Sequence, residues 1–311
     1  IKMKKYLYIV SSLLLYTSCK EKMKEEEVFE IGIKPCKKAA SFIKTIGFDA
    51  NRAAFSTSHN QYKGVVLIQA PNTPTDSLHF YQDSSWKQFG YMGSLTTDKD
   101  GNTYTANIPL VNNLDYAIMD LNRIYKIDAI TGKMEVFFSL PKADSINDVV
   151  PYGILGLYYD CHANKLYVSS VSGSTRNVEK GIIYVIDMET KQIVDDLKGF
   201  DAMGVFVGGN TGEKRLYFGS ARTSKLFSTE LNKDGTFSNK DKVSTDLTLD
   251  NLGPRGNDKI RRIRYDKFGN LTLYAIEFNF SLAAPTQKPE TGYQFNFDDI
   301  EKKWFFKKIL E

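Results

Sequence analysis

The stretch Gly156-Leu-Tyr-Tyr-Asp-Cys-His-Ala-Asn-Lys-Leu-Tyr-Val-Ser-Ser-Val171 decides the fold that this sequence predicts. An apolar run leads into a turn that carries Asp160 and Asn164, and a second run rich in Leu, Tyr and Val follows. Two such runs on either side of a polar turn are typical of a β-hairpin. We therefore expect an all-β protein whose repeated unit contains this hairpin.

The hairpin pattern recurs along the chain. Four other segments repeat it around polar or glycine-containing turns, namely 52–70, 94–107, 203–220 and 262–278. The spacing of about 45 to 60 residues fits the four-stranded blades of a β-propeller. Further strands are expected at 123–128 and 181–187, each followed through a turn by another strand, 134–140 or 192–197. We predict a single β-propeller over residues 28–311.

Five repeats can be counted in the sequence, and we expect a six-bladed ring. Two short strand candidates near the N-terminus, 28–33 and 41–46, are interpreted as belonging to the ring closure. No segment shows a sustained helical period, and the aromatic residues are spread through the strand candidates, as an all-β protein requires.

The N-terminal segment resembles a bacterial lipoprotein signal. A cationic start is followed by an apolar run, 6–16, and then by Thr17-Ser18-Cys19. Eleven apolar residues are too few to span a bilayer, which takes about 20. The resemblance implies a signal peptide at 1–18, lipidation of Cys19 and a charged tether at 19–27. It further implies an outer-membrane lipoprotein that faces the periplasm or the cell surface. An ordinary secretory signal is the alternative.

The charge balance gives no electrostatic reason to expect a nucleic-acid partner. The chain has 41 basic and 37 acidic residues, and three of the lysines lie in the predicted signal peptide. The remaining domain is almost neutral, whereas nucleic-acid binding normally needs a basic stripe. After cleavage before Cys19, two further cysteines remain, Cys36 and Cys161. They can pair or stay as two lone thiols, because 125 residues separate them and spacing alone does not set their distance.

Common catalytic signatures are absent from the sequence. It contains no Gly-x-Ser-x-Gly elbow, no glycine-rich phosphate loop and no His-Glu-x-x-His motif. The three histidines, His59, His79 and His162, are scattered without metal-ligand spacing and are interpreted as surface or turn residues. The run 98–102, Asp-Lys-Asp-Gly-Asn, is interpreted as a hairpin turn and not as a calcium loop.

A propeller places its site at one end of the central channel, beside residues that precede the innermost strand or follow the second. The positions after the second strand are Gln69, Asn107, Ser170, Ser220 with Arg222, and Glu277 with Asn279. The positions before or at the start of the first strand are Arg52, Tyr152, Asp201, Asp258 and Arg261. Polar residues also occur at loop ends for no reason but solvation, so this ring is a hypothesis about the channel.

Three carboxylates in the ring, Asp201, Asp258 and Glu277, are the candidates for a divalent cation or for acid and base chemistry. Three arginines can neutralise these carboxylates or bind an anionic ligand, namely Arg222, Arg255 and Arg261.

Three motifs resemble the propeller superfamily of gluconolactonases, senescence-marker-protein-like lactonases and NHL-type repeat proteins. They are 159–168, 265–271 and 124–133. The resemblance covers about two-thirds of the chain and implies the propeller fold. In the lactonases a channel metal polarises the ester carbonyl and helps to activate water. This chain lacks the Glu-Gly-Pro motif of that family near its start and has Met203-Gly204 at its Asn-Gly step, so no metal ligands are transferred.

The sequence therefore supports three hypotheses about function. The first is a lipid-anchored envelope module that binds a small molecule, a glycan or an envelope protein. The alternative is a lactonase- or esterase-type hydrolase that uses a divalent metal such as calcium. The third is a structural subunit that makes contacts through its rim or the insertion 108–122. No cofactor is assigned outside the hydrolase alternative.

Overall fold

The computed structural model describes residues 23, 25–34, 36–58, 61–73, 75–108, 121–142, 152–209, 211–280 and 290–310. Most of their regular structure is β-strand. Two short helices lie near the N-terminus, α1 (Glu25–Glu30) and α2 (Phe42–Thr45), and a 3-10 helix, η1 (Ser84–Lys87), precedes the second sheet. The prediction of an all-β fold is confirmed.

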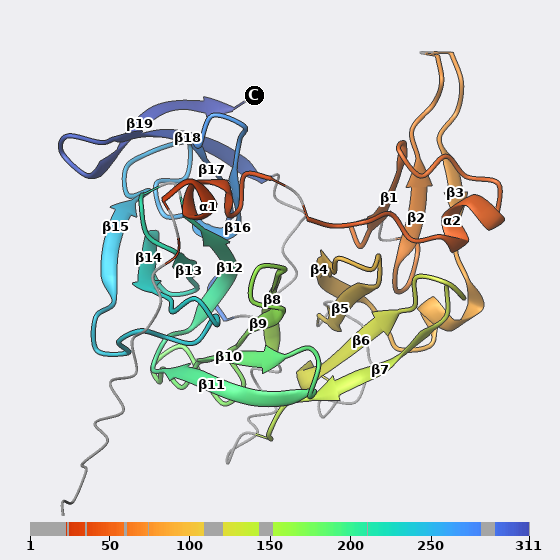
Figure 1. Ribbon diagram of the computed structural model, residues 1–311, viewed down its shortest axis with the longest axis horizontal. Coiled ribbons are helices and arrows are strands. Elements are labelled where there is room, and N and C mark those ends of the chain that lie inside the picture. Colours follow the sequence, from red (N-terminus) through yellow and green to blue (C-terminus); the bar gives the residue numbers. More distant parts are fainter. Residues whose placement is uncertain are drawn as a thin grey trace, which may run out of the picture.

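In the described ranges, nineteen strands form five antiparallel sheets, in each of which the strands follow one another in chain order (Figure 1). The first sheet contains β1 (Ala53–Ser56), β2 (Val66–Gln69) and β3 (His79–Tyr81). The four-stranded sheets contain β4 (Met92–Thr97), β5 (Thr103–Asn107), β6 (Arg123–Ile127) and β7 (Met134–Ser139); β8 (Ile154–Asp160), β9 (Lys165–Ser170), β10 (Ile182–Asp187) and β11 (Gln192–Lys198); β12 (Ala202–Gly208), β13 (Arg215–Ser220), β14 (Lys225–Glu230) and β15 (Ser244–Thr248); and β16 (Lys259–Tyr265), β17 (Leu271–Ile276), β18 (Thr291–Asp298) and β19 (Lys303–Leu310).

Each sheet is one blade, so the propeller has five blades. All five predicted hairpins are present as the first two strands of a blade. The expectation of six blades is wrong, because the described part of the N-terminal segment contributes no strand to any sheet.

The hairpin β8–β9 shows why these segments pair. Leu157 lies opposite Val168 and Tyr159 opposite Leu166, and all four side chains are buried. In the turn, Asn164 adopts φ of +52°, a left-handed conformation that asparagine tolerates better than most residues. Turn chemistry and apolar cross-strand pairs therefore specify the same register.

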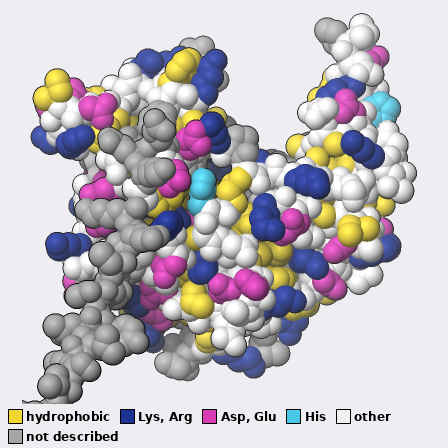
Figure 2. Space-filling view, viewed as in Figure 1, with side chains coloured by type: hydrophobic (Ala, Val, Ile, Leu, Met, Phe, Trp, Pro, Cys, Tyr) yellow, Lys and Arg dark blue, Asp and Glu magenta, His cyan; other side chains and the backbone are white. Residues whose placement is uncertain are grey.

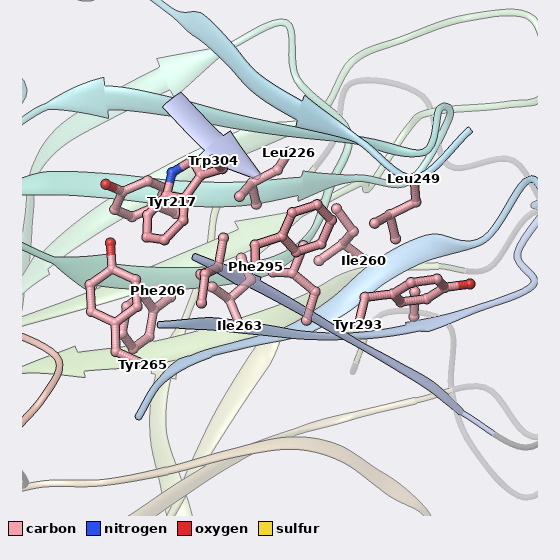
Figure 3. Close-up of a cluster of buried hydrophobic side chains, with 13 residues drawn as sticks. Phe206, Tyr217, Leu226, Leu249, Ile260, Ile263, Tyr265, Tyr293, Phe295 and Trp304 are labelled. Carbon is pink, nitrogen blue, oxygen red and sulfur yellow. The ribbon is translucent and has the colours of Figure 1, made fainter. Parts of the chain in front are cut away.

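Aromatic side chains fill the space between neighbouring blades. Between the fourth and fifth blades, the Tyr265 ring lies 4.9 Å from the ring of Phe206 and 5.9 Å from that of Tyr217. Figure 3 shows Trp304 and Phe295 in the same buried cluster. Tilted and edge-on ring contacts add to the free energy of burial and favour particular packing angles.

The innermost strands of the last four blades share an irregularity near their start. A β-bulge interrupts the register at Met92/Leu95, Ile154/Gly156, Ala202/Val205 and Ile260/Arg262. A bulge leaves a residue out of the ladder and redirects its side chain. Leu155 and Met203 lie at these steps, and both belong to the candidate site described below.

The first sheet packs on the second blade through the buried Trp86. Its indole lies 5.9 Å from the ring of Phe42, 5.6 Å from that of Phe55 and 5.5 Å from that of Tyr81, and Nε1 donates to the Gly132 carbonyl at 2.6 Å. The first sheet is the blade at one end of the row of blades (Figure 1). An open notch separates it from the last sheet in the space-filling view (Figure 2).

The N-terminal segment, residues 25–34 and 36–46, is here called the strap. It runs from α1, beside the fourth and fifth blades, to the first sheet (Figure 1). Ile31 is buried in the core between the third and fourth blades, and its carbonyl accepts from the Gly209 amide at 3.2 Å. Cys36 forms a disulfide with Cys161, with Cα atoms 6.2 Å apart, and Phe42 is buried near Trp86. The pairing of Cys36 with Cys161, one of the two alternatives, is confirmed.

The strand predictions within the strap are wrong. Residues 28–33 begin inside α1, and 41–46 contain α2. Val28 and Ile31 are both buried, and their spacing of three residues places them on one face of a helical turn. A short apolar run does not distinguish helix from strand by periodicity, and here the contact with the blade decides.

None of the helices within the described ranges is long and apolar enough to cross a membrane. The predicted signal peptide, Cys19, His59 and residues 109–120 of the insertion lie outside the described residues. Within the predicted tether, Met23 packs against the core between the third and fourth blades, and α1 begins at Glu25. The run 98–102 forms the predicted hairpin turn, in which the Asp98 carboxylate accepts from two backbone amides at 2.9 Å.

Candidate functional site

An apolar cluster gathers where the inner strands of the third, fourth and fifth blades meet. The strap contacts hairpin turns at one end of these strands, and the cluster lies at the other end. We call it the axial cluster. Its buried members are Val171, Met203, Ala221 and Phe280, and its partly buried members are Tyr152, Leu155, Ile276 and Phe278.

Three rings of the axial cluster pack edge to face. Phe278 lies 5.0 Å from Tyr152 and 4.9 Å from Phe280, and the Tyr152 and Phe280 rings are 6.3 Å apart at an interplanar angle of 90°. Phe280 adopts φ of +57°, which is rare for a bulky residue and costs about 1–3 kcal/mol. Packing holds it there, and backbone strain of this kind concentrates at ligand sites.

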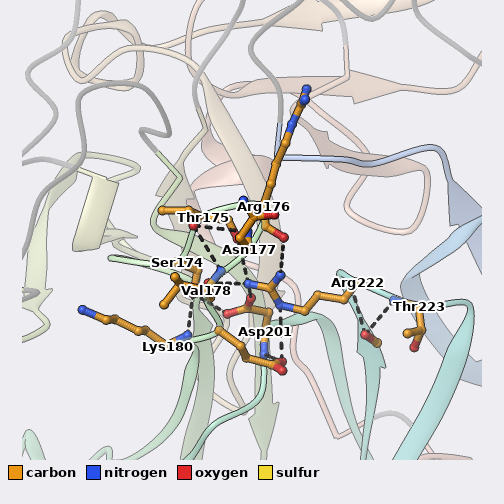
Figure 4. A network of polar contacts seen from close by, with 11 residues as sticks. Ser174, Thr175, Arg176, Asn177, Val178, Lys180, Asp201, Arg222 and Thr223 are labelled. Atoms are coloured by element: carbon orange, nitrogen blue, oxygen red, sulfur yellow. Dashed lines mark hydrogen bonds and ion pairs between the residues drawn. The ribbon is translucent and has the colours of Figure 1, made fainter.

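Arg222 connects the fourth blade to the loop between β9 and β10 of the third. Its guanidinium lies 4.9 Å from the centre of the Phe280 ring. The same group pairs with the Asp201 carboxylate at 2.5 Å and donates to the backbone carbonyls of Thr175 and Arg176 at 2.8 and 3.0 Å. Figure 4 shows the Arg222 side chain reaching into this loop. Arg222 thus orders the loop beside the axial cluster.

Asp201 is the buried centre of this network. Its side chain has no exposed surface, the Ser174 hydroxyl donates to it, and its own backbone amide donates to Glu179 at 2.8 Å. Burial raises the pKa of the Asp201 carboxyl above its ordinary value, although Ser174 and Arg222 act in the opposite direction.

Asp258 occupies the equivalent position in the fifth blade but has a local partner. Arg255 donates to both carboxylate oxygens, from Nε at 2.5 Å and from a terminal nitrogen at 2.9 Å, and the Tyr293 hydroxyl donates at 3.0 Å. The two-point contact raises the pKa of Arg255. Burial, followed by the bond to Asp258, raises the pKa of Tyr293 to about 12.

The two candidate serines hold the backbone of their loops. The Ser220 hydroxyl accepts from the amides of Arg222 and Thr223, both at 3.0 Å, and the Ser170 hydroxyl donates to the Asn122 side chain at 2.8 Å. Both side chains therefore shape the loops that surround the axial cluster.

The remaining candidates of the fifth blade lie around Asp258. Glu277 is half-buried and near enough to affect Arg255 and Lys259 electrostatically. Arg261 is exposed and faces Glu290 at 3.9 Å.

The candidates from the first two blades do not join the axial cluster. Arg52 donates to the Ala70 carbonyl, and Gln69 accepts from the Asp49 amide at 2.5 Å, so both side chains bind backbone next to the strands of the first sheet. The side-chain amide of Asn107 donates to the backbone carbonyl of Phe89, shortly before β4 of the second blade. The structure thus brings together Tyr152 of the third blade with Asp201 and Arg222 of the fourth, and leaves these three candidates apart.

The proposed metal ligands do not form a metal site in the part of the chain that the structure describes. No three His, Cys, Asp or Glu side chains gather there in a way that could hold an ion. Asp201 and Asp258 are each engaged by an arginine. The geometry gives the hydrolase alternative no support.

Sequence reasoning missed the apolar members of the site. The run Glu277-Phe278-Asn279-Phe280 follows β17, and only its polar residues were candidates. The available signal was the two aromatic residues just past the end of a strand. The completed arrangement offers partly buried aromatic rings beside an ordered polar loop, which suits non-covalent binding of a ligand with an apolar face.

No protein-family model matches the chain, and no curated protein matches it. Among solved structures, a protein of unknown function from Bacteroides caccae aligns with a TM-score of 0.43 and 9% sequence identity, over 80% of this chain and 69% of that one. A chain of a nidogen/laminin complex aligns with a TM-score of 0.43 and 12% identity, over 78% and 88% of the two chains. The propeller assignment rests on the sheets of this chain itself.

Proposed function

We propose that this protein is a lipid-anchored binding module of the bacterial cell envelope, and that the axial cluster is its ligand site. One observation carries the proposal: Tyr152 and Phe278 present partly buried rings beside a loop that Arg222 holds in place. Binding sites typically combine apolar and aromatic walls with a few oriented polar groups.

The favoured ligand is a glycan of the cell envelope. A sugar ring has an apolar face of C–H groups that can lie on an aromatic ring, while its hydroxyls can bind the loop backbone and side chains. An envelope protein or another small molecule would use the same rings without this requirement for hydroxyls.

Binding is tested with the chain that begins at Cys19 and a panel of oligosaccharides prepared from peptidoglycan and lipopolysaccharide. A ligand that binds only the folded state stabilises it by about 2.7 kcal/mol at one hundred times its dissociation constant. We expect thermal stabilisation and calorimetric binding with one class of oligosaccharide.

Two variants locate the site. Tyr152→Ala and Phe278→Ala should weaken binding, whereas Phe268→Ala should not, since that aromatic residue is exposed and lies on the hairpin turn between β16 and β17. Binding that survives both site variants would place the ligand elsewhere.

The lipid anchor is tested separately by expression of the whole chain in a Gram-negative host. We expect an acylated N-terminal Cys19 by mass spectrometry and recovery in the outer-membrane fraction. Cys19→Ala should release the protein into the soluble fraction. An unmodified Cys19, or cleavage at another residue, would contradict the anchor and leave the ligand site untouched.

A further inference from the structure

The face opposite the axial cluster is here called the strap face. It comprises the strap and the hairpin turns at that end of the blades, four of which the strap contacts. The Gly209 turn binds Ile31, the Cys161 turn is bonded to Cys36, and the Gly101 turn lies against Ala40. The β6–β7 turn belongs to the same face, since the Ala129 carbonyl accepts from the Phe42 amide at 3.1 Å and from the Ser41 hydroxyl at 2.9 Å.

Ile300, in the β18–β19 turn at the same end of the blades, is 94% exposed, and two further large apolar side chains project from turns of the strap face. Ile130, next to Ala129, is 77% exposed, and Phe268 in the β16–β17 turn is 72% exposed. The β16–β17 turn is the counterpart in the fifth blade of the turns at Gly101, Cys161 and Gly209. Burial of this apolar surface against a partner would be favourable, because it would remove the surface from water.

Lysines accompany both apolar tips. Lys267 precedes Phe268, and its ammonium lies 4.9 Å from the centre of the ring. Lys133 ends the turn that holds Ile130; its side chain is 63% exposed, and its ammonium pairs with the Asp83 carboxylate at 2.9 Å. Apolar and aromatic tips with neighbouring lysines suit the membrane interface, where the apolar part enters the headgroup layer and the ammonium stays hydrated.

We propose that the strap face lies against the bilayer, with Ile130 and Phe268 in the headgroup layer and the axial cluster directed away from it. This inference rests on the lipid anchor proposed above. It assigns a membrane-contact surface and an orientation to the domain, in which the ligand site opens toward the side from which an envelope glycan approaches.

The length of chain between the anchor and the fold supports the bilayer as the occupant. Met23 packs against the core between the third and fourth blades, which also holds Ile31 of the strap. Four residues lead from Cys19 to Met23, and they span at most about 14 Å when fully extended. The headgroup layer on one side of a bilayer is about 5–8 Å thick. The anchor therefore holds the strap side of the domain close to the headgroups.

A weak surface affinity is sufficient under this constraint. The anchor makes the contact intramolecular, so the bilayer is present at a high effective concentration. The strap face also carries exposed acidic side chains, such as Asp100 and Glu213 at 66% and 57% exposure. Because both signs of charge are present, the apolar tips and the anchor supply the contact, and a strongly basic attraction does not.

The test couples the chain that begins at Cys19 to a maleimide-bearing lipid in vesicles of phosphatidylethanolamine and phosphatidylglycerol. This chain retains every residue that the structure describes. Cys36 and Cys161 form a disulfide, so Cys19 is the only free thiol. Chemical coupling separates the question of orientation from the question of whether a cell lipidates Cys19.

Single tryptophans then report which face meets the lipid. Ile130→Trp and Phe268→Trp probe the strap face, and Val178→Trp, at a position that is 44% exposed in the β9–β10 loop, is the matched control beside the axial cluster. The native Trp86 and Trp304 are 0% and 9% exposed and give a constant background. Unchanged thermal unfolding confirms that the variants fold, as expected for exposed positions.

Brominated lipids quench tryptophan on contact. We expect loss of fluorescence from Ile130→Trp and Phe268→Trp and none from Val178→Trp. Quenching of Val178→Trp alone would reverse the orientation, and equal or no quenching of all three would overturn the contact surface. If these results support the orientation but Cys19 carries no lipid in the cell, the anchor fails while the surface preference stands.

Discussion

The two faces of this propeller are held together by different chemistry. On the strap face, the N-terminal segment is attached by a disulfide at Cys36 and by the burial of Ile31 and Phe42 in two separate cores. On the opposite face, the loop between β9 and β10 is ordered by the charged pair of Arg222 and Asp201. Covalent and apolar attachment tolerates the loss of one contact, whereas a buried charged pair depends on both partners.

A second difference lies within the charged face itself. Asp201 and Asp258 precede the innermost strands of neighbouring blades, and both are buried. The partner of Asp201 comes from the end of β13 and also binds the third blade, whereas Arg255 is three residues from Asp258. Equivalent positions in a repeat can therefore serve as a link between blades or as a local clamp.

The largest effect is expected from Arg222→Ala. It leaves the buried Asp201 carboxylate without its counter-ion and frees the carbonyls of the loop, which should lower the free energy of unfolding by about 3–5 kcal/mol. Urea denaturation measures the change. Arg176→Ala is the control, because the Arg176 side chain is exposed and should contribute less than about 0.5 kcal/mol. Equal effects from both variants would contradict the link between blades.

Loss of the disulfide should cost less and affect the other face. The double variant Cys36→Ser, Cys161→Ser removes a constraint on the unfolded chain, which typically contributes about 2–4 kcal/mol. Hydrogen exchange should show faster opening of the strap and unchanged protection of the β9–β10 loop. Faster exchange in that loop would show that the two faces are coupled.

Arg255→Ala should destabilise the protein less than Arg222→Ala does. The Tyr293 hydroxyl still donates to Asp258, and Arg255 also donates to Thr291, which lies in the same blade as Asp258. A loss of about 1.5–3 kcal/mol is expected for a hydrogen bond to a charged group. Urea denaturation of the two arginine variants side by side tests the distinction between local clamp and link. A larger loss from Arg255→Ala would reverse it.

The smallest effect is a pH dependence with a defined sign. Burial raises the folded-state pKa of Asp201 above the unfolded value of 3.8, so the folded state binds this proton more readily. The contribution of the Asp201 carboxyl to the free energy of unfolding is present below its pKa in the unfolded state and is lost as the pH rises through its pKa in the folded state. Asp201→Asn should remove this pH dependence. Urea unfolding of both proteins at several pH values gives the difference in their free energies of unfolding, which reports the Asp201 carboxyl alone. A difference that grows with rising pH would show a lowered pKa.

The strands of the five hairpins, and the outer strands of the second and third blades, were predictable from sequence because their signals are local. Asp160 and Asn164 mark a turn, and Leu166 to Val168 form an apolar strand that pairs across it. The axial site was predictable only in part. Tyr152, Asp201 and Arg222 were found from their positions in the repeat, but Phe278 and Phe280 were missed, since aromatic residues are expected in strand cores as well as in sites.

The sequence by itself determined the five hairpins, the four-stranded pattern of the blades and the near neutrality of the domain, because turn residues and apolar alternation act over a few residues. Only the tertiary structure decided the number of blades, the helical strap, the disulfide and the partner of each buried aspartate. These depend on segments far apart in the chain that meet in space, as Cys36 meets Cys161 across 125 residues. Spacing along the chain does not encode such distances, because packing of whole blades brings the segments together.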